Sequence, residues 1–235
     1  MLYNLNFNKI LFLDIETVPM VETYEKLPER FKKLWDKKAG YLKKQEGDTP
    51  EKLFERAGIY SEFGKIVCIS VGFIKNREFR VKSFYGDDEK TLLEGFSGLL
   101  NKHYHDRDSL LCAHNGKEFD YPYIARRMII NGLQLPKILN IAGKKPWEVA
   151  HLDTMELWKF GDYKSYTSLE LLAAIFGIPT PKGDIDGSQV ASVYYKDKDL
   201  ERISKYCQRD TLTVAQVLLS FMGKAHIKEE DVVYS

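Results

Sequence analysis

Apolar and polar positions follow two different periods along the chain, and together these periods predict an α/β fold. The uninterrupted apolar run Ile10–Leu13 is typical of a central strand that is buried on both faces. Lys65–Lys75 is rich in β-branched residues and Glu78–Tyr85 alternates, so we expect two strands paired as a hairpin across Asn76-Arg77. Asp108–Ala113 is a further short buried strand.

A helical period of apolar residues fills several of the remaining segments. We predict helices from Asp87 or Asp88 to about His103, from Asp120 through Ile129, and over Leu169–Phe176, Gln189–Tyr195 and Leu200–Met222. His151–Thr154 is a candidate fifth strand. Strands that alternate with helices in this way predict a mixed sheet covered by helices.

The segment Met20–Glu62, directly after the first strand, differs from the rest in charge. Its basic residues between positions 26 and 44 are Lys26, Arg30, Lys32, Lys33, Lys37, Lys38, Lys43 and Lys44, and only Glu29 and Asp36 are acidic, which leaves a net charge of +6. Leu27, Phe31, Leu34 and Trp35 recur at helical spacing and predict an amphipathic helix. The segment is either a solvated helical insertion or a basic flap that steers a polyanion, with Trp35 and Tyr41 available for base stacking.

Composition limits the classes of protein that fit. The chain has 235 residues, 44% of them hydrophobic, which suits one α/β domain over residues 1–235 with an insertion at about 20–62. A net charge of +1 means that any nucleic-acid-binding surface must be local. Three isolated cysteines, Cys68, Cys112 and Cys207, predict buried, reduced thiols of a cytoplasmic protein. No membrane-spanning run or signal peptide is evident, so we expect no membrane partner.

Two acids, Asp14 and Glu16, follow the first apolar run. Residues two apart in a strand point to the same face, so both carboxylates project together from the end of a buried strand. Their mutual repulsion is relieved by a hard divalent cation with oxygen ligands, Mg2+ or Mn2+. The alternative is a strand that ends in a polar loop and releases both acids into solvent.

A second polar group follows the strand Asp108–Ala113. Asp120 lies at the start of the next helix, where it is either a third carboxylate beside the first two or an ordinary helix cap. We interpret His114 as structural, because no second histidine or cysteine stands at a metal-ligand spacing. Asp153, in the candidate fifth strand, is a possible outer-shell acid.

The last long helix carries a third group. Tyr206 and Asp210 are four residues apart and therefore share a face, next to a stripe of core residues. An acid beside a core needs a partner, and a cation would supply one. The alternative is a solvent-facing Asp210 that pairs with Arg209 or Lys205.

The order of these groups resembles a known family. Asp-Ile-Glu-Thr at residues 14–17, Asn-x-x-x-Phe-Asp at 115–120 and Tyr-x-x-x-Asp at 206–210 are similar to the three motifs of the DEDD, or DnaQ-like, 3′–5′ exonucleases. The chain resembles the tyrosine variant, because the position that would carry histidine in the other variant is Lys205. The resemblance covers about Lys9 to Met222. Residues 182–188, Lys-Gly-Asp-Ile-Asp-Gly-Ser, further resemble predicted exonucleases related to the proofreading domain of family B DNA polymerases.

This resemblance implies an RNase H-like fold with a five-stranded mixed sheet. It implies a catalytic set of Asp14, Glu16, Asp120, Tyr206 and Asp210, in which the four acids hold two Mg2+ or Mn2+ ions, at about 3.5–4 Å from each other, and Tyr206 orients a water. Thr17, Asn115 and Phe119 are the expected substrate contacts. The expected reaction removes nucleoside 5′-monophosphates from the 3′ end of single-stranded nucleic acid, DNA rather than RNA.

Two other functions remain open. One is a 3′–5′ exoribonuclease or oligoribonuclease of the same chemistry, because nothing in the sequence shows what would read a 2′-hydroxyl group. The other is a non-catalytic nucleic-acid-binding module on the same fold. The presence of all four acids and of Tyr206 argues against the second.

Overall fold

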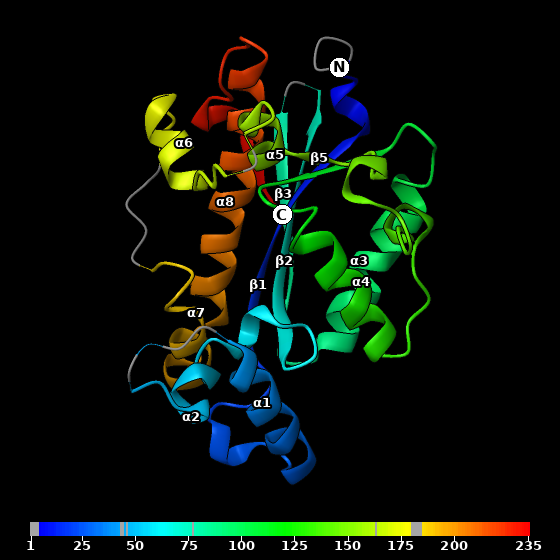
Figure 1. The fold of residues 1–235 in the computed structure, drawn as a ribbon. Coiled ribbons are helices and arrows are strands. Elements are labelled where there is room, and N and C mark those ends of the chain that lie inside the picture. Colours follow the sequence, from blue (N-terminus) through cyan, green and yellow to red (C-terminus); the bar gives the residue numbers. More distant parts are fainter. Residues whose placement is uncertain (1–4, 43–44, 46, 77, 163, 180–184) are drawn as a thin grey trace.

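A six-stranded mixed sheet forms the centre of the computed structural model, which describes residues 5–42, 45, 47–76, 78–162, 164–179 and 185–235 (Figure 1). The strands are β1 (Ile10–Pro19), β2 (Gly64–Lys75), β3 (Glu78–Tyr85), β4 (Leu110–Ala113), β5 (Leu152–Asp153) and β6 (Val232–Tyr234). Their spatial order is β5-β4-β1-β2-β3-β6. The neighbours β1 and β4, β4 and β5, and β3 and β6 are parallel, whereas β2 is antiparallel to both β1 and β3.

The prediction of five strands is wrong by one. The additional strand, β6, pairs with β3 through the register Phe79↔Val232 to Val81↔Tyr234. Three residues are too few to show the period of a strand, so the sequence pattern does not reveal β6. Its position covers the outer edge of β3, which would otherwise expose unpaired backbone groups.

Helices occur in every segment predicted to be helical, and two short helices that the periodicity did not predict occur over Pro50–Phe54 and Thr154–Lys159. The helices are α1 (Glu29–Tyr41), α2 (Pro50–Phe54), α3 (Glu89–His103), α4 (Asp120–Ile130), α5 (Thr154–Lys159), α6 (Leu169–Ile175), α7 (Val190–Ser192), which continues into a π-helix over Val193–Asp197, and α8 (Leu200–Phe221). Short 3-10 turns span Phe7–Lys9, Tyr24–Lys26, Ala57–Ile59, Lys137–Leu139, Pro146–Glu148 and Glu229–Asp231. Among the described residues, no helix has the length and apolar character needed to cross a bilayer.

Alternation along β1 explains how helices cover both faces of the sheet. Leu11, Leu13 and Ile15 pack into a core with α3 and α4, whereas Ile10 and Phe12 pack against α8. In Figure 1, α8 lies on one side of the strands and α3 and α4 lie on the other. Because both faces of β1 are covered, the strand reads as a continuous apolar run, as predicted.

The insertion folds around a small core of its own at one end of the sheet (Figure 1). Trp35 is fully buried there, and its Nε1 donates a hydrogen bond to the Pro50 carbonyl at 2.8 Å. The prediction that Trp35 stacks on bases is therefore wrong, because the helical stripe faces α2 rather than solvent. Tyr41 is 81% exposed. Lys43, Lys44 and residues 182–184 lie outside the described residues.

A buried ion pair attaches the end of the insertion to the helices on the α3 and α4 face. Arg127 on α4 donates from Nε to Oε1 of Glu89 at 2.9 Å and from Nη1 to the Ser61 carbonyl at 2.9 Å. Glu89 also accepts the backbone N–H of Ile66 at 2.7 Å. One turn earlier on α4, the Tyr123 hydroxyl donates to the Gly58 carbonyl at 2.7 Å. The helix that begins with Asp120 is thus tied to the return segment of the insertion.

Candidate active site

The two acids of β1 lie beside each other on the face that α8 covers. Asp14 and Glu16 continue the alternation of Ile10 and Phe12, which pack against α8. The acids do not stand at the end of their own strand, as the sequence predicted, because β1 runs on to Pro19. They lie instead just past the end of β4, whose last pair with β1 is Phe12↔Cys112. Because β4 ends there, the side of β1 next to the two carboxylates is no longer covered by a paired strand.

A register shift follows the acids directly. Glu16 pairs with Cys68 and Thr17 pairs with Ile66, so Val67 of β2 has no opposite residue. Such bulges bend a strand and increase its local twist. Thr17 lies beyond the shift, where its side chain interacts with the hydroxyl of Tyr123 on α4. The extra residue lies on β2, and alternation along β1 separates the acids, which face α8, from Thr17, which faces α4.

Asp120 is buried at the first turn of α4, with 3% of its surface exposed. The residue at the N-cap is Phe119, and α4 has no side-chain cap, so the alternative reading of Asp120 as a cap is wrong. A backbone hydrogen bond from Ile15 reaches the Asp120 carboxylate. This contact joins the start of α4 to β1 between its two acids.

Asp153 holds the loop that leads to Asp120. Its carboxylate accepts the backbone N–H groups of Asn115 at 2.9 Å and Lys117 at 3.0 Å, as well as two at the start of α5. These bonds fix Asn115 in a left-handed conformation with φ of 61°. His114 is bound to Thr154 Oγ1 at 2.9 Å and to the Thr167 carbonyl at 3.0 Å, which fits its predicted structural role.

Tyr206 and Asp210 share one face of α8 and interact through a hydrogen bond between their side chains. Lys205 pairs with Glu201 at 2.7 Å, and the Arg209 guanidinium lies 5.9 Å from the centre of the Tyr206 ring. Among the described residues, neither cation forms an ion pair with Asp210, so the alternative of a solvent-facing pair does not hold. Asp210 points to the same region as the acids of β1, since its charge raises the pKa of both.

Cys207 is the residue of this region that sequence reasoning missed. Its Sγ donates to the backbone carbonyl of Asp14 at 3.3 Å, which ties α8 to β1 at the first acid. Burial raises the pKa of the thiol, so it remains a protonated donor. All three cysteines are free and buried, as predicted. Its position directly after Tyr206 could have indicated a contact with the site. The sequence pattern instead assigned Cys207 to the apolar core stripe of α8.

The electrostatics of the site disfavour four ionised carboxylates. Burial, followed by the charges of Asp210 and Asp120, raises the pKa of Asp14. Burial and the charge of Asp14 raise the pKa of Glu16. Burial also raises the pKa of Asp120 to about 8 and that of Asp210 to about 6. Every one of these shifts indicates that a positive charge would be strongly stabilised here.

An oxygen atom of Asp14 is free to bind a cation. Oδ2 of Asp14 is buried and has no hydrogen-bond partner in the described structure. Ligand atoms of Asp14, Glu16 and Cys207 lie within 4.8 Å of one another. The protonated thiol is already a donor to a carbonyl, so the available ligands are carboxylate oxygens, which hard cations such as Mg2+ and Mn2+ prefer.

Comparison with known proteins decides the family. The family described as "Predicted 3'-5' exonuclease related to the exonuclease domain of PolB" matches residues 59–233. The chain belongs to this family. The match includes Asp120, Tyr206 and Asp210 and begins after β1, so it does not extend to Asp14 and Glu16.

A solved structure shows the same fold. The family B DNA polymerase from the hyperthermophilic archaeon Pyrobaculum calidifontis is 18% identical, with a TM-score of 0.52. The alignment covers 91% of this chain and 25% of the polymerase chain, so this member of the exonuclease family spans about a quarter of that protein. The α/β architecture with a mixed sheet, predicted from the RNase H-like resemblance, is confirmed at the level of the fold.

Proposed function

We propose that the chain is a metal-dependent 3′–5′ exonuclease that shortens single-stranded nucleic acid, DNA in preference to RNA, and releases nucleoside 5′-monophosphates. The observation that carries the proposal is the buried, unpartnered Oδ2 of Asp14 among acids from three separate elements. Membership of a family of predicted 3′–5′ exonucleases supports the same reaction. A non-catalytic binding module would have no need for four buried acids of which two, Asp14 and Glu16, have pKa values raised by the charges of the others.

Asp14, Glu16, Asp120 and Asp210 would hold two Mg2+ or Mn2+ ions. When bound, such ions activate a water as the nucleophile and stabilise the negative charge of the departing oxygen. The protein's own contribution is to fix the carboxylates before the ions arrive. The Cys207 thiol positions the backbone of Asp14, and the Ile15 backbone positions Asp120. Asp153 holds the loop of Asn115.

Substrate contacts are proposed on the α4 side of the acids. Thr17 interacts with the Tyr123 hydroxyl, and the Phe119 and Tyr123 rings lie 5.3 Å apart between centres. Asn115 extends from the loop between β4 and α4, held by its backbone, so its side chain is not needed to fix the loop. We propose that Thr17, Phe119 and Asn115 contact the 3′-terminal nucleotide, as the family resemblance implies.

Tyr206 is proposed to orient the attacking water. Burial and the charges of Asp210 and Glu16 raise the pKa of its phenol, which therefore stays protonated at neutral pH. A protonated hydroxyl can hold a water by a hydrogen bond but cannot remove its proton. Its partner Asp210 fixes the direction of the hydroxyl.

Tyr206→Phe is expected to lower kcat by about 10- to 100-fold, the size typical of residues that orient a ligand rather than bind the metal. The interaction acts mainly in the transition state, so KM and Mn2+ affinity should stay within about twofold of the wild type. Steady-state kinetics on a single-stranded oligonucleotide would measure this, with Tyr85→Phe at the exposed end of β3 as the matched control. A higher KM with unchanged kcat would identify Tyr206 as a substrate contact instead.

The proposed function is tested by digesting matched single-stranded DNA and RNA that carry a 5′ label. With Mg2+ or Mn2+ present, we expect a ladder of 5′-labelled products that shortens from the 3′ end, and faster digestion of DNA. Faster digestion of RNA would favour an exoribonuclease on the same site. Cleavage inside the strand, or no cleavage of either polymer, would contradict the proposal.

The basic insertion is proposed to contact the substrate backbone. Lys33 and Lys37 are exposed one turn apart on α1, whereas Lys38 Nζ lies 4.0 Å from the centre of the Tyr60 ring and Lys32 Nζ lies 5.9 Å from that of Tyr24. Lys33 and Lys37 are therefore the freer cations of the four central lysines. The insertion leaves β1 directly after Pro19, three residues beyond Glu16, so it begins near the candidate active site.

Changing Lys33 and Lys37 together to glutamine should weaken binding to all single strands alike. Each lost phosphate contact reduces the slope of log affinity against log salt by about 0.7, so the pair should reduce it by about 1.4. Fluorescence anisotropy at several salt concentrations would measure the slope. The control with the same loss of charge is Lys90→Gln with Lys102→Gln, two exposed positions on α3. Equal slopes in both double variants would mean that the insertion is only a solvated surface.

A further inference from the structure

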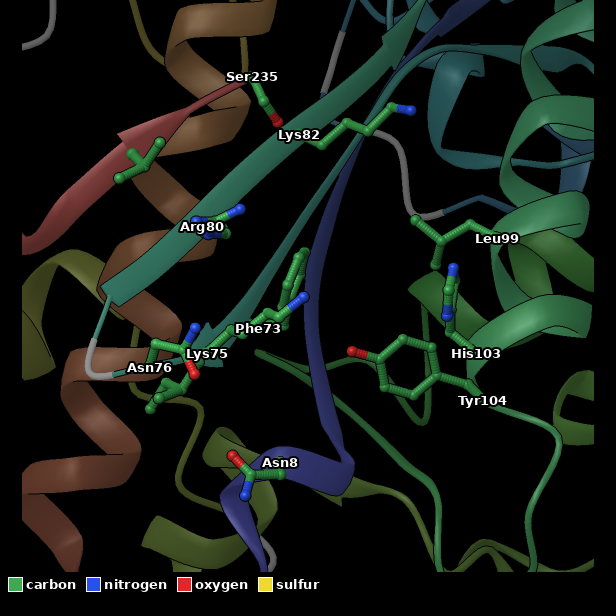
Figure 2. Close-up of a pocket in the computed structure, with 12 residues that line it drawn as sticks. Asn8, Phe73, Lys75, Asn76, Arg80, Lys82, Leu99, His103, Tyr104 and Ser235 are labelled. Carbon is green, nitrogen blue, oxygen red and sulfur yellow. The ribbon is translucent and has the colours of Figure 1, made fainter.

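A cavity of about 660 Å3 lies between the far end of the β2–β3 hairpin and the carboxyl-terminal end of α3 (Figure 2). Small-molecule sites commonly have volumes of about 300–1,000 Å3. Asp14 pairs with Ser70 of β2, and Phe73, which lines the cavity, lies three residues further along and faces α3 instead of α8. The sheet therefore separates this cavity from the candidate active site.

The floor of the cavity is apolar and carries one free hydroxyl group. Phe73 and Leu99 supply apolar surface, and the Tyr104 ring completes it. Tyr104 is only 7% exposed, and its hydroxyl has no hydrogen-bond partner among the described residues. Figure 2 shows this hydroxyl pointing away from α3 toward the side on which Phe73 lies. The hydroxyl faces the open cavity, where a polar ligand group can replace water as its hydrogen-bond partner.

The rim of the cavity is basic. Lys75, Arg80 and Lys82 line it, and no described lining residue has a carboxylate side chain. Arg80 is paired with Glu78 at 2.7 Å, so its charge is partly neutralised. Lys75 and Lys82 form no ion pair with a described residue, although Lys82 Nζ lies 4.9 Å from the centre of the Phe84 ring. Two unpaired ammonium groups above an apolar floor suit a ligand with an anionic end and a planar, largely apolar body.

We infer that this cavity binds a nucleoside monophosphate as a second nucleotide site, remote from the catalytic acids. The base would lie against Phe73, the Tyr104 hydroxyl would donate to a polar edge of the base or sugar, and Lys82 would contact the phosphate, while Lys75, at the Phe73 end of the cavity, would add attraction at longer range. The choice of a nucleotide among planar anions rests on the proposed function, whose product is a nucleoside 5′-monophosphate. The site thus gives the enzyme a place where its product is bound away from the reaction.

The test is a calorimetric titration of deoxyadenosine monophosphate into the full chain carrying Asp14→Asn, with EDTA present. Under these conditions the metal-dependent site cannot bind the nucleotide through metal ions, and we expect the cavity to bind one nucleotide per chain. Lys82→Gln should weaken this binding about tenfold and Tyr104→Phe about fivefold, from the loss of one charged and one neutral hydrogen bond. Lys102→Gln, an exposed change on α3 outside the cavity, should leave it unchanged.

Two further measurements keep the outcome clear. Tyr104→Phe should not lower the melting temperature, because the hydroxyl has no partner to lose. Deoxyadenosine and inorganic phosphate should each bind at least about tenfold more weakly than the nucleotide, since deoxyadenosine lacks the phosphate group and phosphate lacks the base and sugar. No binding, binding unchanged in both cavity variants, or equal binding of phosphate alone would overturn the inference. Nuclease activity of the wild type is measured separately, so failure of this site and failure of the proposed function are distinguishable.

Discussion

Replacing Asp14 by asparagine is expected to reduce hydrolysis by far more than the about 10- to 100-fold lost when a residue outside the metal's own ligands is changed. The reason is geometric: the backbone carbonyl of Asp14 accepts the Cys207 thiol of α8, and the buried Oδ2 of Asp14 has no partner among the described residues. Asparagine keeps the shape of the side chain but removes one anionic oxygen. Glu16→Gln, Asp120→Asn and Asp210→Asn should have effects of the same order.

The same variant should be at least as stable as the wild type when no metal is present. The pKa of Asp14 is raised in the folded protein, first by burial and then by Asp210 and Asp120. A carboxyl group with a raised pKa favours folding while it is protonated, and this contribution is lost as the pH rises through the folded-state pKa. Asparagine does not ionise, so above that pH it avoids the penalty that the wild type bears.

Turnover with Mg2+ and thermal unfolding in EDTA measure the two halves of this prediction. An inactive variant of undiminished stability indicates a functional carboxylate. Full activity would exclude Asp14 from the metal site, and a large fall in melting temperature in EDTA would indicate a structural role instead.

Arg127→Ala is expected to destabilise the protein by about 3–5 kcal/mol, because it leaves the carboxylate of Glu89 buried without its partner. The side chains of Arg127 and Glu89 are 10% and 8% exposed, so water cannot take over the interaction. The change also removes the donor to the Ser61 carbonyl, which holds the end of the insertion against α4. Urea unfolding monitored by circular dichroism would measure the loss.

Two variants make this second prediction specific. Arg126→Ala, at the exposed neighbouring position on α4, should change the free energy of unfolding by less than about 0.5 kcal/mol. Arg127→Met combined with Glu89→Gln should recover much of the stability, since glutamine still accepts the Ile66 N–H and carries no charge. If Arg127→Ala is no worse than Arg126→Ala, the pair does not hold the insertion.

Much of the site was predictable because strand and helix periods are local properties. A period of two in β1 assigns Asp14 and Glu16 to one face, whatever covers that face. A spacing of four residues does the same for Tyr206 and Asp210 on α8. Both rules depend only on short stretches of backbone, and the structure confirms both placements.

What the sequence could not predict depends on contacts between distant segments. The helical stripe of α1 indicates that Trp35 shares a face with apolar neighbours, but not that this face packs against α2. The contact between Cys207 and the carbonyl of Asp14 joins residues far apart in the chain. The acids were expected at the end of β1, but they lie in the middle of that strand, just past the last residue of β4 that pairs with it.

The most direct test of the cation site is a calorimetric titration of Mn2+ into the metal-free wild type and into Asp14→Asn. The proposal that Asp14, Glu16, Asp120 and Asp210 hold two ions predicts that the wild type binds two ions per chain and that the variant binds at least one of them more than about tenfold more weakly. Identical binding curves for the two proteins, or no binding of Mn2+ to the wild type, would contradict a metal site at the meeting point of β1, α4 and α8.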